Sequence, residues 1–397
     1  MLANFFNSED FRCSHSVSFS YRQSASYAEG FRRRVKHEMP VYPLAFPDLS
    51  KLSFLPGNFP LLGRRLITAM SRLLLAGPIL MYEILVLFRL FKKISPDILH
   101  INNGGYPAAL SARAAAIAGK LAGVPKILMT VNNMAVGYHL FSRWLEYPLD
   151  ILVGRAVDLF ITGSGAAAAR LSFVLSLPEN RVLAIHNGIA MRKQSAGAVA
   201  TRQRLGLKKF GGVVFGVVAV MESRKGHQVL LEAIAKLSAE NAIRDQDLII
   251  LIEGDGHLRQ ELVDFVYNHG LGHLVSFVGA EGNIVDFMSI LDVLILPSIR
   301  DEDFPNVILE AMALGKPVIA SRLAGTPEQL IEGVTGLLVE AGNVAQLSEA
   351  IVYLVNKPCV RNEMGLAALE RFNDHFTSEI AIKNYVKMYS QLSVTRG

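Results

Sequence analysis

Two glutamates and two adjacent cations in the second half of the chain are the residues whose types and spacing could do chemistry. Arg224-Lys225-Gly226 follows an apolar run. Glu302 and Glu310, eight residues apart, follow a second apolar run. A lysine beside a helix N-terminus binds phosphate, because the first N–H groups of a helix lack partners. A carboxylate can accept hydrogen bonds from ribose hydroxyls. A phosphorylated nucleoside ligand would use all of these groups, although a solvated loop and surface charge would explain each one alone.

The elements that must position these residues follow from two alternating patterns, short β-branched runs and longer stretches of helical period, which indicate parallel α/β units. The expected strands of the first half are 17–20, 97–101, 127–131 and 159–162, with helices at 79–93, 108–122 and 165–176. The second half predicts strands at 213–220, 248–253, 275–279, 293–297, 317–320 and 336–339. Its expected helices are 226–240, 257–269, 283–290, 306–314, 327–331, 344–356 and 378–392. The candidate residues then lie at carboxyl ends of strands, where doubly wound sheets bind ligands.

Composition bounds the class of protein. The chain has 397 residues, 51% hydrophobic and 19% charged, which suits two globular domains, and its two cysteines are too few for a disulfide framework. Up to residue 190 there are 20 Lys and Arg against 11 Asp and Glu, or +9, and the remainder carries 20 against 24, or −4. The basic half, with its Arg32–Lys36 run, suits an anionic partner. The apolar stretch Leu73–Phe91 contains Glu83 and Arg89, so we expect a buried or membrane-skimming helix rather than a span.

Together these residues resemble the family 4 glycosyltransferases. Glu302 and Glu310 match the Glu-x7-Glu motif of that family, the segment FPNVILEAMALGKPVIA from Phe304 to Ala320 is its most characteristic stretch, and Lys225-Gly226 is its Lys-Gly. The pairs Gly254-x-Gly256 and Gly325-x-x-Glu328 and the turn Asn187-Gly188 also fall in register. The resemblance implies the GT-B fold, two Rossmann-like doubly wound domains facing across a cleft. It places an acceptor-side domain at 1–187, a nucleotide-sugar domain at 188–375 and a final helix, 376–397, that crosses back to the first domain.

The resemblance also implies roles for residues. Lys225, Arg224 and Glu302 would act on the diphosphate and the donor sugar, and Glu310 would hold the ribose. Donor binding would further involve Asp303, Phe304, Pro305, Asn306, Val307, Gly254, Gly256, Gly279, Asn187, Gly188 and Asn132, with the loop Ala280–Asn283 near the base. Similar enzymes transfer a sugar with retention of configuration, and the leaving phosphate takes the acceptor proton. We expect a UDP- or GDP-sugar donor, no cofactor and no metal, although Asp245-x-Asp247 and Asp301-x-Asp303 superficially resemble a metal-binding motif.

The sequence departs from the family pattern at several positions. Val220 stands where the family has an arginine, Asn132 where it has a histidine, and Asp303 where it has a glycine. The first domain keeps His100, but Asn102 replaces a second histidine. The first strand and Gly-rich loop of the family are not recognisable, and Leu2–Asp10 reads as the end of a first helix, so we expect an incomplete N-terminus.

Several functions remain open at the level of sequence. The preferred one is transfer of a sugar to a glycan or lipid-linked acceptor of the cell envelope, for lipopolysaccharide, capsule or exopolysaccharide. We expect it to occur in the cytoplasm, with peripheral association at the inner face of the membrane. A non-catalytic sugar-nucleotide binder, a sugar-nucleotide epimerase and a phosphorylase share the fold. Nucleic acid is not expected as a partner, because no basic stripe is interleaved with aromatic residues.

Overall fold

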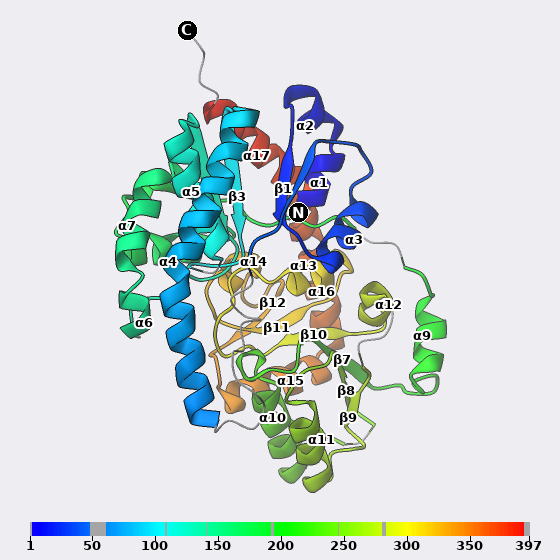
Figure 1. Ribbon diagram of the computed structural model, residues 1–397. Helices are drawn as coiled ribbons and strands as arrows, with labels where there is room; N and C mark the ends of the chain where they lie inside the picture. Colours follow the sequence, from blue (N-terminus) through cyan, green and yellow to red (C-terminus); the bar gives the residue numbers. More distant parts are fainter. Residues whose placement is uncertain are drawn as a thin grey trace. The chain divides into compact units, whose positions relative to one another are not determined.

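A computed structural model describes residues 2–47, 61–107, 109–139, 141–191, 194–244, 246–279 and 283–392 (Figure 1). The chain divides into two compact units. Unit 1 comprises Met1–Thr162, Ala168–Ala184 and Asn384–Gly397, and unit 2 comprises Gly163–Ala167 and Ile185–Lys383. Each unit is built from parallel strands and helices, so the mixed α/β class expected from the alternating patterns is correct.

Unit 1 contains a four-stranded parallel sheet of order β3-β4-β5-β6. Its strands are β3 (Ile98–Asn103), β4 (Lys126–Val131), β5 (Leu159–Thr162) and β6 (Val182–Ala184). Two further strands, β1 (Phe19–Arg22) and β2 (Val41–Leu44), pair in parallel as a separate sheet. Parallel strands put their carboxyl ends at one edge, and therefore the segments after β3 and β4 begin side by side.

Helices cover both faces of the β3–β6 sheet. One face packs against α4 (Leu61–Ile94), α5 (Leu110–Ala122), α7 (Tyr147–Ala156) and α8 (Gly165–Leu175). Helix α8 belongs to unit 1 from Ala168 onward. The alternate residues of the strands face the other way: His100 contacts Tyr389 of α17 (Ser378–Leu392), and Tyr385 of the same helix contacts Phe5. The N-terminal helices α1 (Leu2–Asn7) and α2 (Glu9–Ser14) thus lie against the C-terminal part of α17.

Helix α4 is longer than the sequence predicts. The expected helix begins at Ile79, yet α4 runs from Leu61 through Pro78 to Ile94. A proline removes one backbone hydrogen bond, but packing of α4 along α5 outweighs this local cost. Glu83 is buried within α4, and desolvation raises its pKa to about 7. In the described part of the chain, no helix has the length and apolar character needed to cross a bilayer.

Unit 2 contains a six-stranded parallel sheet of order β12-β11-β10-β7-β8-β9. The strands are β7 (Val213–Val218), β8 (Leu248–Glu253), β9 (Val275–Phe277), β10 (Val293–Leu296), β11 (Val318–Ser321) and β12 (Gly336–Val339). Nearly all of their residues are buried, because helices cover both faces. The order reverses between the neighbours β7 and β10, and such a switch point is where doubly wound sheets bind ligands.

The two faces of this sheet carry different helices. Val213, Phe215 and Val217 share one core with α10 (His227–Ala239), α11 (Arg259–Asn268) and α15 (Val344–Asn356). Val214, between them in the strand, joins the opposite core with α12 (Ile284–Ser289), α13 (Asn306–Ala313) and α16 (Pro358–His375). This alternation is the period of two expected of a strand. Figure 1 shows α10, α11 and α15 together on one side of the sheet.

Several sequence expectations need correction. The strand expected at 17–20 lies two residues later as β1, since Val17 and Ser18 precede the pairing with β2. The segment read as the end of one helix is two short helices, because Ser8 caps α2 with its side chain. Elements that the patterns did not predict are β2, β6, α3 (Ala25–Arg34), α6 (Phe141–Trp144), α7, α9 (Ala198–Arg204) and α16. The short helix α14 (Thr326–Gln329) begins one residue before its expected start.

Candidate functional site

The candidate donor site of unit 2 lies where β7 and β10 end. The chain leaves β7 through Met221 and forms a 3-10 turn, Ser223–Lys225, before α10 begins. It leaves β10 at Leu296 and reaches α13 at Asn306. Because β7 and β10 are parallel neighbours, these two connections start at the same edge of the sheet. The cations of the first connection therefore meet the carboxylates of the second.

A charged cluster joins the two connections. The Lys225 ammonium donates to the Oε1 atom of Glu302, and the Ser298 hydroxyl donates to the same oxygen over 2.8 Å. The Nη1 atom of Arg224 lies 3.6 Å from that oxygen, and its Nε atom lies 2.6 Å from Glu222. The Glu302 and Lys225 side chains are largely buried, at 8% and 14% exposure. Unit 2 thus holds two cations around one shielded carboxylate, an arrangement that can exchange the carboxylate for a bound diphosphate.

Gly226 allows this approach of the two connections. Its backbone has φ +69°, and a Cβ atom there would stand 1.9 Å from the carbonyl oxygen of Pro297. Any other residue would push the turn away from β10, which explains the Lys-Gly pair. The next residue, His227, is buried at the start of α10. Desolvation and the nearby Lys225 charge lower its pKa to about 4, so His227 is neutral near pH 7.

Helix α13 begins immediately after the cluster. Pro305 is its N-cap, with φ −66° and no side-chain cap, and Asn306 and Val307 form its first turn. The first backbone N–H groups of the helix therefore lack a capping side chain. Glu310 stands one turn further along and is half-buried, whereas Ile308 and Leu309 are fully buried. Glu310 is thus less buried than the two residues that precede it in α13.

Asp303 links this region to the short segment that follows β5. Its side chain is buried and accepts a hydrogen bond from the Ser164 hydroxyl, and its carbonyl accepts from the Gly325 N–H over 2.9 Å. Desolvation raises the pKa of Asp303 to about 6, since it outweighs the Ser164 hydrogen bond, while the nearby Glu328 charge raises the pKa further. A glycine at this position could not make the Ser164 bond, so the departure from the family pattern has a structural role.

Ser164 and His186 are residues of this region that the sequence reading missed. His186 stacks on the Phe304 ring at 4.8 Å and bonds to Glu328 over 3.0 Å. Glu328 also accepts from the N–H groups of Gly165 and Ala166 at 2.9 and 3.0 Å. Although burial works against ionisation, these hydrogen bonds hold the pKa of Glu328 below its ordinary range. His186 directly precedes Asn187-Gly188, and that position was the available signal for it.

The glycine pairs serve close backbone contacts. A Cβ atom at Gly254 or Gly256 would lie 2.1 or 2.4 Å from the carbonyl oxygen of Ala219 or Met221, so this loop packs directly on the segment after β7. Gly279, with φ +70°, follows β9, which is separated from β10 by β7 and β8. The expected base loop, Ala280–Asn283, lies outside the described residues except for Asn283, which caps α12.

The interdomain turn belongs to unit 2, and the asparagine predicted from the first half of the chain belongs to unit 1. Gly188 packs on residue Thr377, whose carbonyl would stand 2.1 Å from a Cβ atom, and neighbouring Asn187 is half-buried. Asn132 belongs to unit 1. Its amide donates to the Asn102 side chain over 2.9 Å and to the Asn103 carbonyl over 2.8 Å, and it thereby joins the carboxyl ends of β3 and β4.

His100 of unit 1 is held in a neutral state. Its ring bonds to the Tyr389 hydroxyl and, over 2.7 Å, to the Thr130 hydroxyl. Desolvation lowers its pKa to about 4. The described residues contain no group of three or more His, Cys, Asp and Glu side chains that could hold a metal ion. Asp245, one of the acidic residues weighed for this role, lies outside them.

Comparison with known proteins assigns the chain. The family model described as Glycosyltransferase Family 4 matches residues 27–193, and the one described as Glycosyl transferases group 1 matches residues 202–371. The chain belongs to glycosyltransferase family 4. The first match covers most of unit 1 and the second most of unit 2 of this family 4 chain, and the resemblance seen in the sequence is correct.

Individual relatives agree with this assignment. An uncharacterized glycosyltransferase from Methanocaldococcus jannaschii is 32% identical over 54% of this chain and 55% of its own length. A lipopolysaccharide core biosynthesis glycosyltransferase from Rhizobium meliloti is 26% identical over 64% of this chain and 70% of its own length. The family 4 chain spans only about half the length of several curated relatives that it matches.

Solved structures show the fold. HepE from Anabaena, crystallised in complex with UDP, has a TM-score of 0.75 at 18% identity, covering 98% of this chain and 95% of that one. A glycosyltransferase from Rickettsia africae gives 0.73 at 17% identity, with 98% and 94% covered. The family 4 chain therefore has the GT-B fold of two Rossmann-like domains that the resemblance implied.

Proposed function

We propose that this chain transfers a sugar from a UDP-sugar to a glycan or lipid-linked acceptor of the cell envelope, with retention of anomeric configuration. The observation that carries the proposal is the convergence of Lys225 and Arg224 on Glu302 beside the start of α13. Few ligands need two cations, an uncapped helix N-terminus and a carboxylate one turn further along. A nucleoside diphosphate needs all of them.

Each group has a part in donor binding. The diphosphate takes the place of Glu302 beside Lys225, and the first N–H groups of α13, from Asn306 on, donate to its oxygens. Glu310 accepts hydrogen bonds from the two ribose hydroxyls. Phe304, Pro305 and Val307 supply backbone and apolar contact along the donor, and Glu302 turns toward the hydroxyls of its sugar.

Uridine is the proposed base, although the charged cluster would bind any nucleoside diphosphate. The support is indirect: HepE from Anabaena, which shares the fold, has been crystallised in complex with UDP and with UDP-glucose. Gly254, Gly256 and Gly279 follow β8 and β9, and we place the base near them because those strands lie on the far side of β7 from β10.

The transfer step uses the donor's own phosphate as the base. The bond between the sugar C1 and the diphosphate oxygen breaks, and the acceptor oxygen bonds to C1 on the same face. The acceptor proton passes to the departing phosphate oxygen, so UDP leaves with the proton and the configuration is retained. Lys225 and Arg224 stabilise the negative charge that develops on the diphosphate, which is the main contribution of the protein. The proposal requires no metal and no further cofactor.

The acceptor is inferred from charge and from relatives. Arg32, Arg33 and Arg34 end helix α3 of unit 1, and cations of this kind are attracted to anionic lipid surfaces. Relatives are named for lipopolysaccharide core and for capsular polysaccharide biosynthesis. We therefore propose work at the cytoplasmic face of a membrane, on a lipid-linked or lipopolysaccharide acceptor.

A second candidate is a sugar-nucleotide binder without transfer activity. Val220, two residues after β7, is 56% exposed and stands where the family has an arginine. Asn132 stands where the family has a histidine, and its amide donates hydrogen bonds to Asn102 and Asn103 of β3. Both positions lack an ionisable side chain that the family pattern provides. Such a binder would hold UDP but would not release it from a UDP-sugar when acceptor is added.

Thermal shift with UDP, GDP and ADP tests the donor site. At 100 times its dissociation constant a nucleotide stabilises the native state by about 2.7 kcal/mol. UDP should raise the melting temperature, and Lys225→Ala and Glu310→Ala should abolish the shift. Lys209→Ala and Glu349→Ala are matched controls, since both residues are exposed and Lys209 precedes β7 at the opposite end of that strand. A folded chain that responds to no nucleotide would refute the proposal.

A further inference from the structure

Helices α6 (Phe141–Trp144) and α7 (Tyr147–Ala156) of unit 1 bury two charged side chains and expose several large apolar ones. Arg143 and Asp150 are buried, at 6% and 2% exposure, whereas Trp144 and Leu152 are 57% and 52% exposed. Surface helices normally bury the apolar side chains and expose the charged ones. The buried side of α7 also holds the apolar Val153 and Ala156, so the unusual feature is the pair of buried charges together with several exposed apolar side chains.

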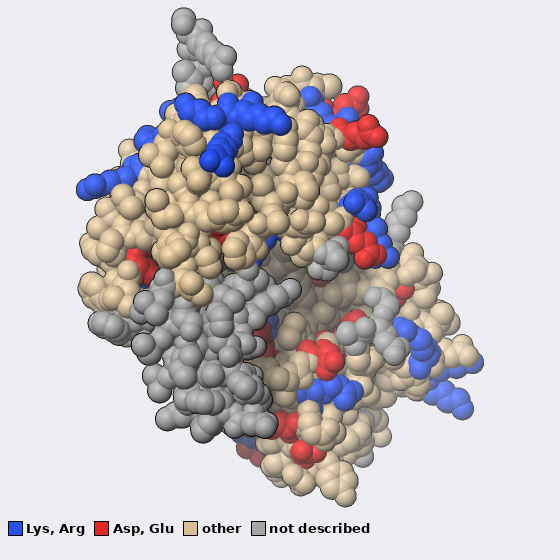
Figure 2. All heavy atoms as spheres, in the orientation of Figure 1, with Lys and Arg blue, Asp and Glu red and all other residues tan. Residues whose placement is uncertain are grey.

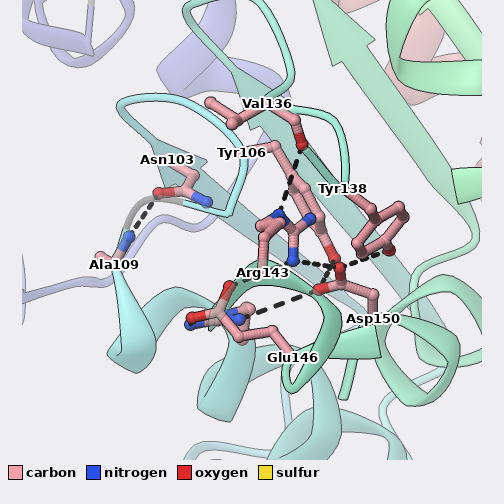
Figure 3. Close-up of polar contacts among 9 residues, drawn as sticks. Asn103, Tyr106, Ala109, Val136, Tyr138, Arg143, Glu146 and Asp150 are labelled. Carbon is pink, nitrogen blue, oxygen red and sulfur yellow. Dashed lines mark hydrogen bonds and ion pairs between the residues drawn. The ribbon is translucent and has the colours of Figure 1, made fainter. Parts of the chain in front are cut away.

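A buried ionic network holds this orientation (Figure 3). The Nη1 atom of Arg143 lies 2.5 Å from Asp150 and 3.1 Å from Glu146. Arg113 of α5 bridges the same two carboxylates at 3.3 and 3.8 Å. The hydroxyls of Tyr106 and Tyr138 donate to Asp150 over 3.0 and 2.7 Å. Since a buried carboxylate without these partners would be costly, the network fixes which side of α7 faces inward.

The side that faces outward is a continuous apolar surface, which we call the outer face. It comprises Val136, Trp144, Leu145, Tyr147, Pro148, Ile151 and Leu152. The Trp144 ring lies 5.4 Å from Tyr138 and 6.1 Å from Tyr147, so three aromatic rings cluster at one end. Tyr147, Ile151 and Arg155 follow at helical spacing along α7. A contiguous exposed patch of this kind marks a surface that binds something.

The charge around the outer face is positive. Segment 141–156 contains two carboxylates, Glu146 and Asp150, and both are paired with arginines of the network. Arg155 is exposed on the same side of α7. Arg170 bonds to the carbonyl next to Val136, over 3.2 Å, and its guanidinium lies over a ring that is 78% exposed, Phe173. In the view of Figure 2, the surface of unit 1 over α6 and α7 is mostly uncharged, with Asp or Glu at one place and Lys and Arg toward its upper edge.

We propose that the outer face docks on a membrane surface that contains anionic lipid. Tryptophan and tyrosine favour the interface between headgroups and acyl chains, and exposed leucine and isoleucine side chains insert just below it. Flanking arginines interact with lipid phosphates, and burial of Asp150 and pairing of the partly exposed Glu146 with Arg113 and Arg143 reduce the repulsion that would oppose them. The inference rests on the proposed work at a membrane, and it names the surface that makes the principal contact, to which the basic end of α3 adds a weaker electrostatic attraction.

The chain provides its own reporter for this contact. Trp144 is the single tryptophan in the sequence and lies in the outer face. Its emission can be followed with vesicles of phosphatidylcholine, with and without phosphatidylglycerol, and with brominated lipids that quench only nearby tryptophan. The informative variant is Leu152→Glu, which keeps the reporter. Leu366→Glu is its matched control, because Leu366 is 70% exposed on α16 of unit 2. A triple Arg32→Gln, Arg33→Gln, Arg34→Gln variant tests α3.

The outer face should give a blue shift and bromine quenching of Trp144 with anionic vesicles. Leu152→Glu should weaken vesicle binding at least about tenfold, whereas Leu366→Glu and the triple variant should change it less than about threefold. Three results would overturn the proposal: Trp144 emission unchanged by vesicles, equal binding by Leu152→Glu, or a blue shift that depends on protein concentration without lipid, which would indicate a second copy. The thermal shift with UDP, measured on the same variants, distinguishes this proposal from the proposed function. A chain that keeps the UDP shift but does not bind vesicles would contradict the docking surface and leave the donor site intact.

Discussion

Lys225 donates a hydrogen bond to Glu302, a residue 77 positions further along the chain, and the same carboxylate oxygen accepts from Ser298. The ammonium that would bind a diphosphate is therefore already neutralised by a carboxylate of the site. A diphosphate must replace this carboxylate, and once it has done so Glu302 is released toward the donor sugar. The pair thus connects occupancy of the phosphate site with the position of the second functional group.

Replacing Glu302 by glutamine should separate binding from transfer. Glu302→Gln keeps the shape but removes the charge that competes for Lys225, so the affinity for UDP should rise, by roughly tenfold if about 1.4 kcal/mol of competition is removed. Sugar transfer should fall by about 100-fold or more, because a group that addresses the donor sugar in the transition state is altered. Calorimetric titration with UDP and a UDP-release assay measure the two effects.

Glu222→Gln is the control for that experiment, since Glu222 pairs with Arg224 but not with Lys225. Its affinity for UDP should change much less. Weaker UDP binding by Glu302→Gln, as expected for Lys225→Ala, would mean that the carboxylate contacts the nucleotide directly. The proposal that the diphosphate replaces Glu302 beside Lys225 would then be wrong.

Glu310 should be selective for ribose hydroxyls. The native chain should bind UDP more tightly than 2′-deoxy-UDP, by about 10- to 150-fold, because a hydrogen bond to a charged group contributes roughly 1.5–3 kcal/mol. Glu310→Gln should bind both nucleotides with similar, weaker affinity. Titration of the two nucleotides into the two proteins forms a double cycle. An undiminished preference for UDP in Glu310→Gln would move the ribose elsewhere.

Asp303 should make stability depend on pH. Its pKa is raised from 3.8 to about 6 in the folded chain, so between these values the native state binds a proton that the unfolded state has released. The stabilisation from this proton is complete below about pH 4 and is lost as the pH rises through 6. Asp303→Asn mimics the protonated side chain and should gain stability relative to the native chain over that window, at most about 3 kcal/mol. Urea unfolding followed by circular dichroism at pH 4.5 and 7 measures the difference in the free energy of unfolding between the variant and the native chain. The same difference at both pH values would contradict the prediction.

The ionic network beneath α7 should be essential for the stability of unit 1. Asp150→Asn leaves Arg113 and Arg143 with one carboxylate between them, and breaking a buried pair typically costs about 3–5 kcal/mol. Trp144 lies in unit 1, and its emission during urea unfolding therefore reports this unit. The exposed Glu179, also in unit 1, provides the control Glu179→Gln, which should leave the midpoint unchanged. Equal midpoints for the native chain and Asp150→Asn would show that the network contributes nothing.

The proximity of Lys225 and Glu302 was predictable because it follows from strand order. Once the apolar runs before Arg224 and Ser298 are read as parallel strands, their carboxyl ends must share an edge. The strands β5, β8 and β12 have the bounds that the periodicity predicts, since each is a buried run between turn residues. The same reasoning also assigns α13 and the position of Glu310 within it.

Contacts that depend on tertiary packing were not predictable. Nothing in the sequence around Ser164 indicates a bond to Asp303, 139 residues away. Arg143 and Asp150 have the spacing of solvated surface charges, yet they are buried, and Trp144 and Leu152 are exposed, so the pattern of α6 and α7 was not recognised as helical. Helix α4 continues through Pro78 for a similar reason, because packing along α5 overrides the local preference.

Transfer of labelled sugar to a membrane acceptor tests the central claim most directly. The chain is incubated with radiolabelled UDP-sugars and membranes of its source, and the lipid-extractable and polysaccharide fractions are counted. The account predicts label in one of them with the native chain, with a new glycosidic bond of the same configuration as the donor, and no label with Lys225→Ala. A native chain that binds UDP but labels no fraction with any UDP-sugar would contradict transfer and indicate a binder.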